Sequence, residues 1–410
     1  MTAWVLAAVA GCATAPPAPV PPAPVTVPPP AVLPPPALVP PSAAPSLPAK
    51  YVPVAWNALP GWSDDRVDEA WPAFRVGCTA LVNAAATSAV WQRPCAAANS
   101  VAPADRNAVR QFFESYFSPY QVLAADGSDK GMVTGYYEPL LDGSRTRGAR
   151  FHVPLYATPD DLLTIDLTEL YPEMKDKRLR GRVEGKRVIP YWPRADIENG
   201  NAPFKSTPLV YVEDPVEAFF LQIQGSGRVR LAEGGIVRVG YADQNGHPYR
   251  SIGRLLVERG ELPLARASMQ GIRDWGRHNP AKLGPLLDEN PSYVFFREVE
   301  APAPGTLEAQ IDGPFGTLGV PLLRERTIAV DPRSIPLGAP VYLATTYPLS
   351  TQPLQRLMLA QDTGGAIRGA MRADFFWGFG DDAGRQAGRM KQDGRMWILW
   401  PTDAGPPLPR

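Results

Sequence analysis

The amino-terminal stretch of the chain is too rich in proline and too poor in charge to form a globular domain. Seventeen of the 49 prolines of this 410-residue sequence lie in residues 1–53, and residues 1–49 contain no Asp, Glu, Lys or Arg. Proline fixes φ and has no amide hydrogen to donate, so such a segment favours extended polyproline II over helices or sheets. We predict a disordered tether over residues 13–50, which leaves about 360 residues for a folded body of about two domains.

A short apolar run precedes this tether. Residues 3–11 are apolar, but a helix needs about 20 residues to span a bilayer. The run ends in Val9-Ala10-Gly11-Cys12, and small residues directly before a cysteine resemble the cleavage site of a bacterial lipoprotein. We therefore predict a lipoprotein signal region over residues 1–12 with Cys12 lipidated; the alternative is a free thiol in a disordered tail. No Lys or Arg precedes the run, so we expect the natural start to lie upstream.

The charge balance and the missing motifs exclude several classes of function. The sequence has 41 basic and 41 acidic residues, so no net field attracts nucleic acid. It contains no HExxH, GxxxxGK[ST], GxSxG or GxGxxG motif, and its three histidines, His152, His247 and His278, are far apart. Isolated histidines are usually structural. We therefore expect neither a metal site nor a cofactor.

The two remaining cysteines, Cys78 and Cys95, have a simple interpretation in an exported protein. An oxidising compartment favours a disulfide that closes a short loop. The alternative is a pair of buried thiols. Because there is no CxxC motif or Cys/His cluster, a structural zinc site is not expected.

The hydrophobic periodicity indicates a mainly β body with peripheral helices. Ala108, Val109, Phe112, Phe113 and Tyr116 share a helical face with Asp105 as the N-cap, and Ser268 is placed to cap a helix containing Ile272 and Trp275. Further helices are predicted around 252–256 and 283–287, and 301–316 is predicted to be a connection. Strands are predicted at 132–139, 188–191, 209–212, 219–223, 236–241, 327–330, 341–345, 357–361 and 396–400.

Three aspartates of the last third are candidates for acid–base chemistry. Asp331, Asp362 and Asp374 each follow a strand or lie among apolar and aromatic residues. Burial raises the pKa of a carboxyl group, and a second carboxylate raises it further, as a general acid requires. The alternative, that the aspartate caps a turn, is strongest for Asp331 and weakest for Asp374.

Aromatic and amide side chains cluster in the same motifs, and together they suit the faces and hydroxyls of sugar rings. The alternative is that the aromatic residues belong to an ordinary core. The set comprises Tyr136, Tyr137, Phe219, Phe220, Trp275, Phe375, Phe376 and Trp377 with Gln222, Gln224, Ser226, Asp243, Gln244 and Asn245.

Several long motifs, taken together, resemble the membrane-bound lytic murein transglycosylase A family. They lie at 133–139, 219–227, 241–253 and 290–296, and a three-aspartate segment, the 3D domain, follows them. The resemblance covers about residues 50–402. It implies a double-psi β-barrel from 50–137 and 301–410, a smaller β-barrel inserted at 138–300, and a groove for the glycan between them.

The resemblance also implies an activity and its residues. Family members cleave peptidoglycan glycan strands without water, so Asp374 is expected to be the catalytic acid and base, supported by Asp362. The family has His-Phe before this aspartate, whereas this chain has Arg372-Ala373, which leaves contacts of the nearby subsite open. The residues expected to contact substrate are Thr134, Tyr136, Tyr137, Gln222, Gln224, Ser226 and Asp331.

The expected setting is the periplasmic face of the outer membrane, where a lipid anchor and the tether would let the enzyme reach the wall. Cell-wall synthesis proteins are a further candidate class of partner. Two other functions remain open at this point. One is a hydrolase in which Asp374 is the acid and Asp362 activates water, and the other is a non-catalytic wall-binding module.

Overall fold

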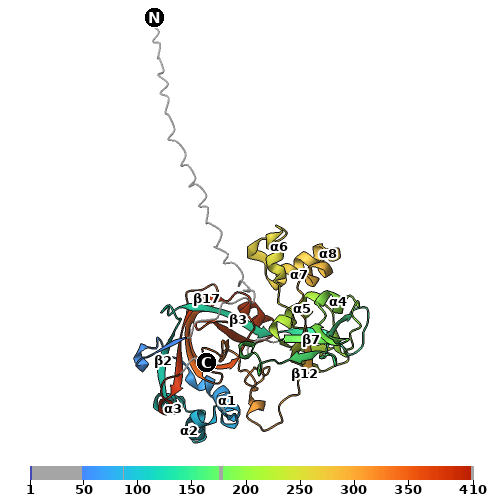
Figure 1. Cartoon of the computed structure of the whole chain (residues 1–410). Helices are drawn as coiled ribbons and strands as arrows, with labels where there is room; N and C mark the ends of the chain where they lie inside the picture. The colour runs from blue at the N-terminus through green and yellow to red at the C-terminus, as the bar shows by residue number, and fades with distance from the viewer. Residues whose placement is uncertain (2–48, 86, 175–178, 408–410) are drawn as a thin grey trace. The chain divides into compact units, whose positions relative to one another are not determined.

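The computed structural model describes residues 1, 49–85, 87–174 and 179–407 (Figure 1). The predicted lipidation site, Cys12, and nearly all of the predicted tether lie outside these residues. Within the described residues, no helix combines the length and the apolar character that crossing a membrane requires.

Strands from both ends of the folded body form one eight-stranded sheet. Its order is β1-β2-β17-β14-β15-β13-β16-β3, and β17 also pairs with β3. The six strands from β17 through β14, β15, β13 and β16 to β3 therefore form a closed ring of pairings. The bounds are β1 Lys50–Pro53, β2 Phe117–Leu123, β3 Gly131–Glu138, β13 Thr327–Val330, β14 Pro340–Thr346, β15 Pro353–Asp362, β16 Ala373–Phe379 and β17 Lys391–Pro401.

The intervening segment forms separate sheets. A six-stranded sheet has the order β12-β11-β10-β4-β9-β5, and an isolated bridge between Ala157 and Phe296 links its two edges. A separate three-stranded sheet has the order β6-β7-β8. The bounds are β4 Leu140–Ser144, β5 Val153–Tyr156, β6 Leu163–Ile165, β7 Leu179–Glu184, β8 Arg187–Pro190, β9 Pro208–Val212, β10 Ser226–Leu231, β11 Ile236–Gln244 and β12 Val294–Glu298.

The helices lie around these sheets, and α6, α7 and α8 gather in one group next to α5 (Figure 1). The α-helices are α1 Trp71–Asn83, α2 Ser88–Ala98, α3 Arg106–Tyr116, α4 Arg194–Glu198, α5 Pro215–Gln224, α6 Ile252–Glu258, α7 Met269–His278, α8 Pro280–Asp288 and α9 Gly380–Ala387. Short 3-10 helices span Trp56–Ala58, Val67–Ala70, Pro172–Met174, Leu264–Arg266, Glu308–Gln310 and Thr402–Ala404.

The largest hydrophobic core lies between the eight-stranded sheet and helices α1 to α3. Trp71 and Phe74 of α1 stack at 5.5 Å between ring centroids, and Phe113 of α3 packs edge-on against both. Cys78 and Cys95 form a disulfide that joins α1 to α2, with 5.5 Å between their Cα atoms. In the chain-entropy account, a loop of this length stabilises the fold by about 3 kcal/mol.

Most of the predicted elements are present, and the fold is mainly β with some helices. Asp105 caps α3 and Ser268 caps α7, each through a side-chain oxygen that accepts a backbone N–H. The strand predicted at 219–223 is wrong, because this segment is the centre of α5. β16, which carries Asp374, was not among the predicted strands. The double-psi topology implied by the resemblance stays a prediction.

Candidate active site

Four neighbouring strands bring two of the three aspartates into one row. Ala329 of β13 pairs with Asp362 of β15 on one side and with Asp374 of β16 on the other. Asp374 in turn pairs with Thr134 of β3. Directly paired residues point to the same face of a sheet. The register between β13 and β15 shifts at Ala329, but both carboxyl groups act electrostatically on Tyr136. They therefore share a face, with Cα positions roughly 10 Å apart by two strand spacings.

Among the described residues, Asp374 has one hydrogen-bond donor and a second carboxylate nearby. Thr134 Oγ1 donates to Asp374 Oδ1 at 2.5 Å. Burial raises the pKa of Asp374, and the charge of Asp362 adds to this, while the charge of Arg372 and the bond from Thr134 act in the opposite direction. The net result is a pKa above the ordinary value. A carboxyl group in this state can hold a proton closer to neutral pH.

Asp362 is surrounded by donors. The backbone N and Oγ1 of Thr317 each donate to Asp362 Oδ1 at 3.0 Å, and the Tyr136 hydroxyl donates to Oδ2 at 3.1 Å. Burial raises the pKa of Asp362, and these hydrogen bonds, with a further one from the backbone of Thr363, oppose the rise without cancelling it. Thr317 is a site residue that the sequence analysis missed.

Tyr136 is a neutral donor to Asp362 and lies close enough to Asp374 to be affected by its charge. Its ring lies 5.1 Å from that of Phe376. Burial raises the pKa of Tyr136 well above its usual range, and the charges of Asp362 and Asp374 raise it further. The structure thus brings together four of the predicted site residues, Asp374, Asp362, Thr134 and Tyr136.

Arg372 forms hydrogen bonds to the Thr134 side chain and to two backbone oxygens. Its Nη2 donates to Thr134 Oγ1 at 2.7 Å, and its Nη1 donates to the backbone oxygens of Met132 at 3.2 Å and Ala373 at 2.5 Å. Burial lowers the pKa of Arg372, while the charge of Asp374 raises it. In the sequence, Arg372 stands out only as a departure from the family pattern.

Asp331 has a different environment. It is 1% exposed, and Arg333 donates to both of its oxygens, at 3.0 and 2.7 Å. The backbone N of Gly369 adds a bond at 2.7 Å. Burial alone would raise the pKa of Asp331, but the bonds from Arg333 and Gly369 and the Arg333 charge together lower it. Asp331 directly follows β13, and its bond from Gly369 therefore connects the end of β13 to the loop before Asp374.

The predicted residues of α5 and β10 divide into two kinds. Gln222 is 8% exposed, and its Oε1 accepts from Arg194 Nη2 at 2.6 Å inside the inserted segment. Gln224 Oε1 instead accepts from the backbone N of Tyr137 at 3.2 Å, at the end of β3. Ser226 is half-buried at the start of β10. Gln224 and Tyr137 are therefore joined, whereas the Gln222 oxygen is occupied by a structural partner.

Other members of the aromatic and amide cluster serve the fold. Phe219, Trp275 and Phe375 are buried in hydrophobic cores. Asn245 Nδ2 donates to two backbone oxygens, those of Trp192 and Pro291, at 2.9 and 2.7 Å. For these three aromatic residues, the alternative of an ordinary core holds.

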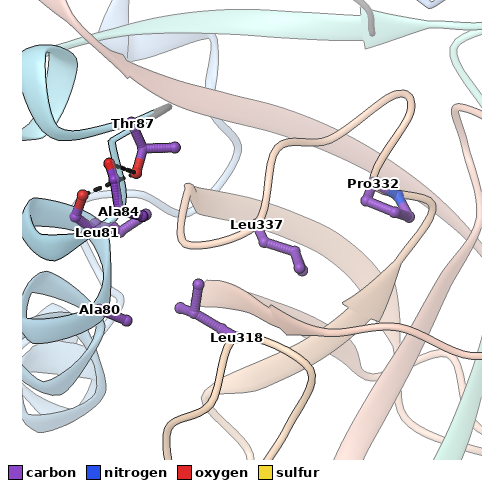
Figure 2. Close-up of a pocket in the computed structure, with 7 residues that line it drawn as sticks. All are labelled: Ala80, Leu81, Ala84, Thr87, Leu318, Pro332 and Leu337. Atoms are coloured by element: carbon purple, nitrogen blue, oxygen red, sulfur yellow. Dashed lines mark hydrogen bonds between the residues drawn. The ribbon is translucent and has the colours of Figure 1, made fainter. Parts of the chain in front are cut away.

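A small apolar pocket opens between α1 and the loops of the eight-stranded sheet (Figure 2). Leu81, Leu318 and Leu337 line it, and none of the predicted site residues does. Leu318 follows Thr317, and its backbone N donates to Gln361 O at 3.0 Å. This side of the pocket therefore helps to hold Thr317 against Asp362. In the described part of the chain, no three His, Cys, Asp or Glu side chains gather as metal ligands would.

Comparisons with known proteins identify two family domains in the chain. The MltA specific insert domain matches residues 132–297, and the 3D domain matches residues 326–400. Membrane-bound lytic murein transglycosylase A of Escherichia coli K12 is 33% identical over 303 residues, which is 72% of each chain. The chain therefore belongs to the membrane-bound lytic murein transglycosylase A (MltA) family.

Solved structures give the same result. The crystal structure of MltA from Neisseria gonorrhoeae is 40% identical, with a TM-score of 0.76 over 93% of this chain and 99% of that one. The lytic transglycosylase LtgG of Burkholderia pseudomallei is 47% identical, with a TM-score of 0.58 over 87% and 98%. E. coli MltA with bound chitohexaose is 27% identical, with a TM-score of 0.58 over 87% and 93%.

Proposed function

We propose that this enzyme cleaves the β-1,4 bond between N-acetylmuramic acid and N-acetylglucosamine in peptidoglycan and leaves a 1,6-anhydromuramoyl end. Its family membership supports the class, a peptidoglycan lytic transglycosylase. The E. coli relative with bound chitohexaose supports a glycan strand as the ligand. The reaction and the roles of the aspartates are our proposal.

In the first step, Asp374 is the general acid. Its proton passes to the glycosidic oxygen as the bond between that oxygen and C1 of the muramoyl residue breaks. The departing glucosamine end thereby becomes a neutral alcohol, and positive charge develops at C1. The observation that carries this assignment is the environment of Asp374, whose pKa is raised by burial and by Asp362.

In the second step, the same carboxyl group is the base. The Asp374 carboxylate takes the proton of the muramoyl C6 hydroxyl, and the C6 oxygen bonds to C1. No water enters, and Asp374 ends in its starting state. Most glycosidases need a second carboxylate as base or nucleophile. An internal nucleophile is already held near C1, so a single acid–base group suffices.

The test of this assignment is Asp374→Asn, assayed on purified sacculi by mass spectrometry of the released fragments. General acid–base catalysis contributes about 10²- to 10⁴-fold, so we expect a loss of that order. Asp403→Asn is a matched control, because Asp403 is exposed and pairs with Arg93 on the surface. Normal release of anhydro fragments by Asp374→Asn would show that another group is the acid.

One feature favours hydrolysis as a second candidate. Asp362 lies two strands from Asp374 on the same face, and inverting glycosidases separate their carboxyl groups to make room for water. Products heavier than the anhydro form by one water molecule would identify this reaction. The hydrogen bonds to Asp362 count against it, because they hold its oxygens as acceptors and weaken it as a base.

We further propose that the glycan lies between the eight-stranded sheet and the inserted segment at 138–300, within reach of Tyr137, Gln224 and Ser226. The bond that joins Gln224 to Tyr137 at 3.2 Å supports this position. Substrate contact by Gln222 or Asp331 would require these side chains to leave the partners described above.

We also propose that Cys12 anchors the enzyme to the periplasmic face of the outer membrane through its lipid. The motif around Cys12 and the membrane-bound relatives support this. Labelling with a radioactive fatty acid should mark the full chain and not Cys12→Ser. Labelling of both would exclude Cys12 as the anchor.

A further inference from the structure

Two hydrogen bonds meet at one hydroxyl beside the proposed acid. Thr134 Oγ1 receives a bond from Arg372 Nη2 at 2.7 Å and gives one to Asp374 Oδ1 at 2.5 Å. Thr134 is 4% exposed, so bulk water does not compete for this hydroxyl. The three side chains thus form a chain of hydrogen bonds from the Arg372 guanidinium, through the Thr134 hydroxyl, to the Asp374 carboxyl group.

The direction of these bonds follows from the chemistry of the groups. A guanidinium can only donate, so the Thr134 oxygen is the acceptor toward Arg372. The single Thr134 hydrogen then needs an acceptor of its own, and Asp374 Oδ1 is the one the described residues supply. A hydroxyl hydrogen left unpaired in such a buried position costs about 1–3 kcal/mol. Asp374 Oδ1 is therefore held as an acceptor.

Arg372 is itself fixed in place. Its Nη1 donates to the backbone oxygens of Met132, in β3, and Ala373, at the start of β16. The guanidinium is half-buried, and the carboxyl group whose charge acts on it is that of Asp374. Backbone carbonyls thus hold the guanidinium with Nη2 directed at Thr134.

We propose that Arg372 is a positioning residue, which acts through Thr134 to make Asp374 Oδ1 an acceptor and so places the acid proton on Oδ2. This rests on the proposed role of Asp374. No hydrogen bond from the described residues reaches Oδ2, so this oxygen is available to substrate. Oδ2 gives its proton to the glycosidic oxygen and then takes the proton of the C6 hydroxyl. Without the guanidinium, the Thr134 oxygen can instead accept a hydrogen bond from a proton on Oδ1. In that state Oδ2 has no proton to give to the glycosidic oxygen.

The experiment compares Arg372→Met, Thr134→Val and the double variant on purified sacculi. Each single change should lower kcat by roughly ten- to a hundredfold with little change in KM, because binding is intact and the proton is misplaced. The double variant should be no slower than the slower single one, because both changes break the same chain of hydrogen bonds. Multiplied losses in the double variant would overturn the proposal.

Two further variants separate positioning from folding. Thr134→Ser keeps the hydroxyl and should retain most of the activity, whereas Thr134→Val should not. Arg254→Met is the matched control, because it removes an exposed guanidinium paired with Glu258 in α6 and should leave kcat unchanged. Equal losses in Thr134→Ser and Thr134→Val would contradict a role for the hydroxyl.

The pH profile gives a readout that a purely structural role would not move. Arg372 lowers the pKa of Asp374 through its charge. Arg372→Met should therefore shift the alkaline limb of kcat/KM to higher pH, and Arg372→Lys should shift it less. An unmoved profile would overturn the proposal. Asp374→Asn is measured in parallel: if it is active, the proposed function fails, whereas if it is inactive and Arg372→Met behaves like the wild type, only this inference fails.

Discussion

Asp362 and Asp374 have raised pKa values in different surroundings, and the difference assigns their roles. Asp362 accepts two bonds from Thr317, one from Tyr136 and one from the backbone of Thr363. Asp374 accepts a single bond from the described residues, that of Thr134. Donors stabilise the charged form of a carboxyl group. Asp362 is therefore the better place for the negative charge, and Asp374 is the better place for the proton.

This assignment predicts the effect of Asp362→Asn on the pH profile. The Asp362 charge raises the pKa of Asp374, so removing it should lower that pKa. Because the reaction needs protonated Asp374, activity should be lost at lower pH, and the alkaline limb of kcat/KM should move down. This is opposite to the shift expected for Arg372→Met. We expect kcat to fall about tenfold or more, and an upward shift would refute the assignment.

At the scale of single residues, the motifs predicted the centre of the site better than its surroundings. Asp374 and Tyr136 were found because each lies in a long motif that the family shares. Thr317 was missed, because it lies 45 residues before Asp362 at the end of a Pro- and Gly-rich connection and contacts the aspartate only in the fold. Gln222 also lies in a shared motif and was predicted to contact substrate. The motif does not show that Gln222 Oε1 accepts a hydrogen bond from Arg194 in the fold.

At the scale of elements, α5 shows why a short apolar run is ambiguous. The run at 219–223 fits a buried strand or a buried helix equally well, and periodicity alone does not decide between them. The flanking residues do decide. Asp214 is the N-cap, Pro215 follows at the first helical position, and Gly225 adopts φ 79° at the C-terminal end. These are the start and stop signals of a helix, and both are visible in the sequence.

The cap predicts a measurable contribution of Asp214 to stability. Its side chain accepts from the backbone N atoms of Val216 at 2.8 Å and Glu217 at 3.2 Å, and it pairs with Arg273 of α7 at 2.6 Å. Asp214→Ala should lower the free energy of unfolding by about 1–2 kcal/mol in chemical denaturation. Asp214→Asn keeps the capping oxygen and should cost less. Equal losses in the two variants would attribute the effect to the ion pair.

At the scale of the whole molecule, the pairings that close the main sheet join residues far apart in the sequence. Lys391 pairs with Thr134, and Asp374 pairs with Thr134 from the other side. No local pattern encodes such partners, so periodicity could predict the strands and not their order. The length of the folded body predicted about two domains, whereas their bounds came from the family resemblance alone.

The chain passes between the two β units at two points, and Arg228 forms hydrogen bonds to a residue at each point. It lies in β10, and its side chain donates to Glu138 Oε2 at 2.8 Å, at the end of β3 where the chain leaves the main sheet. Its two Nη atoms each donate to Asp312, at 3.0 Å, where the chain returns. Glu138 is 1% exposed, and burial raises its pKa although the Arg228 charge opposes the rise.

Arg228→Met should therefore destabilise the whole folded body. It leaves the buried Glu138 carboxylate without its partner, and breaking a buried pair in this way costs about 3–5 kcal/mol. Asp312→Asn is the matched control, because Asp312 is 67% exposed and such pairs are worth about 1 kcal/mol or less. The double variant Arg228→Met/Glu138→Gln should recover part of the loss, because it removes the unpaired charge. Chemical denaturation measures all three, and a loss in Arg228→Met no larger than that in Asp312→Asn would show that the buried pair does not hold the two units together.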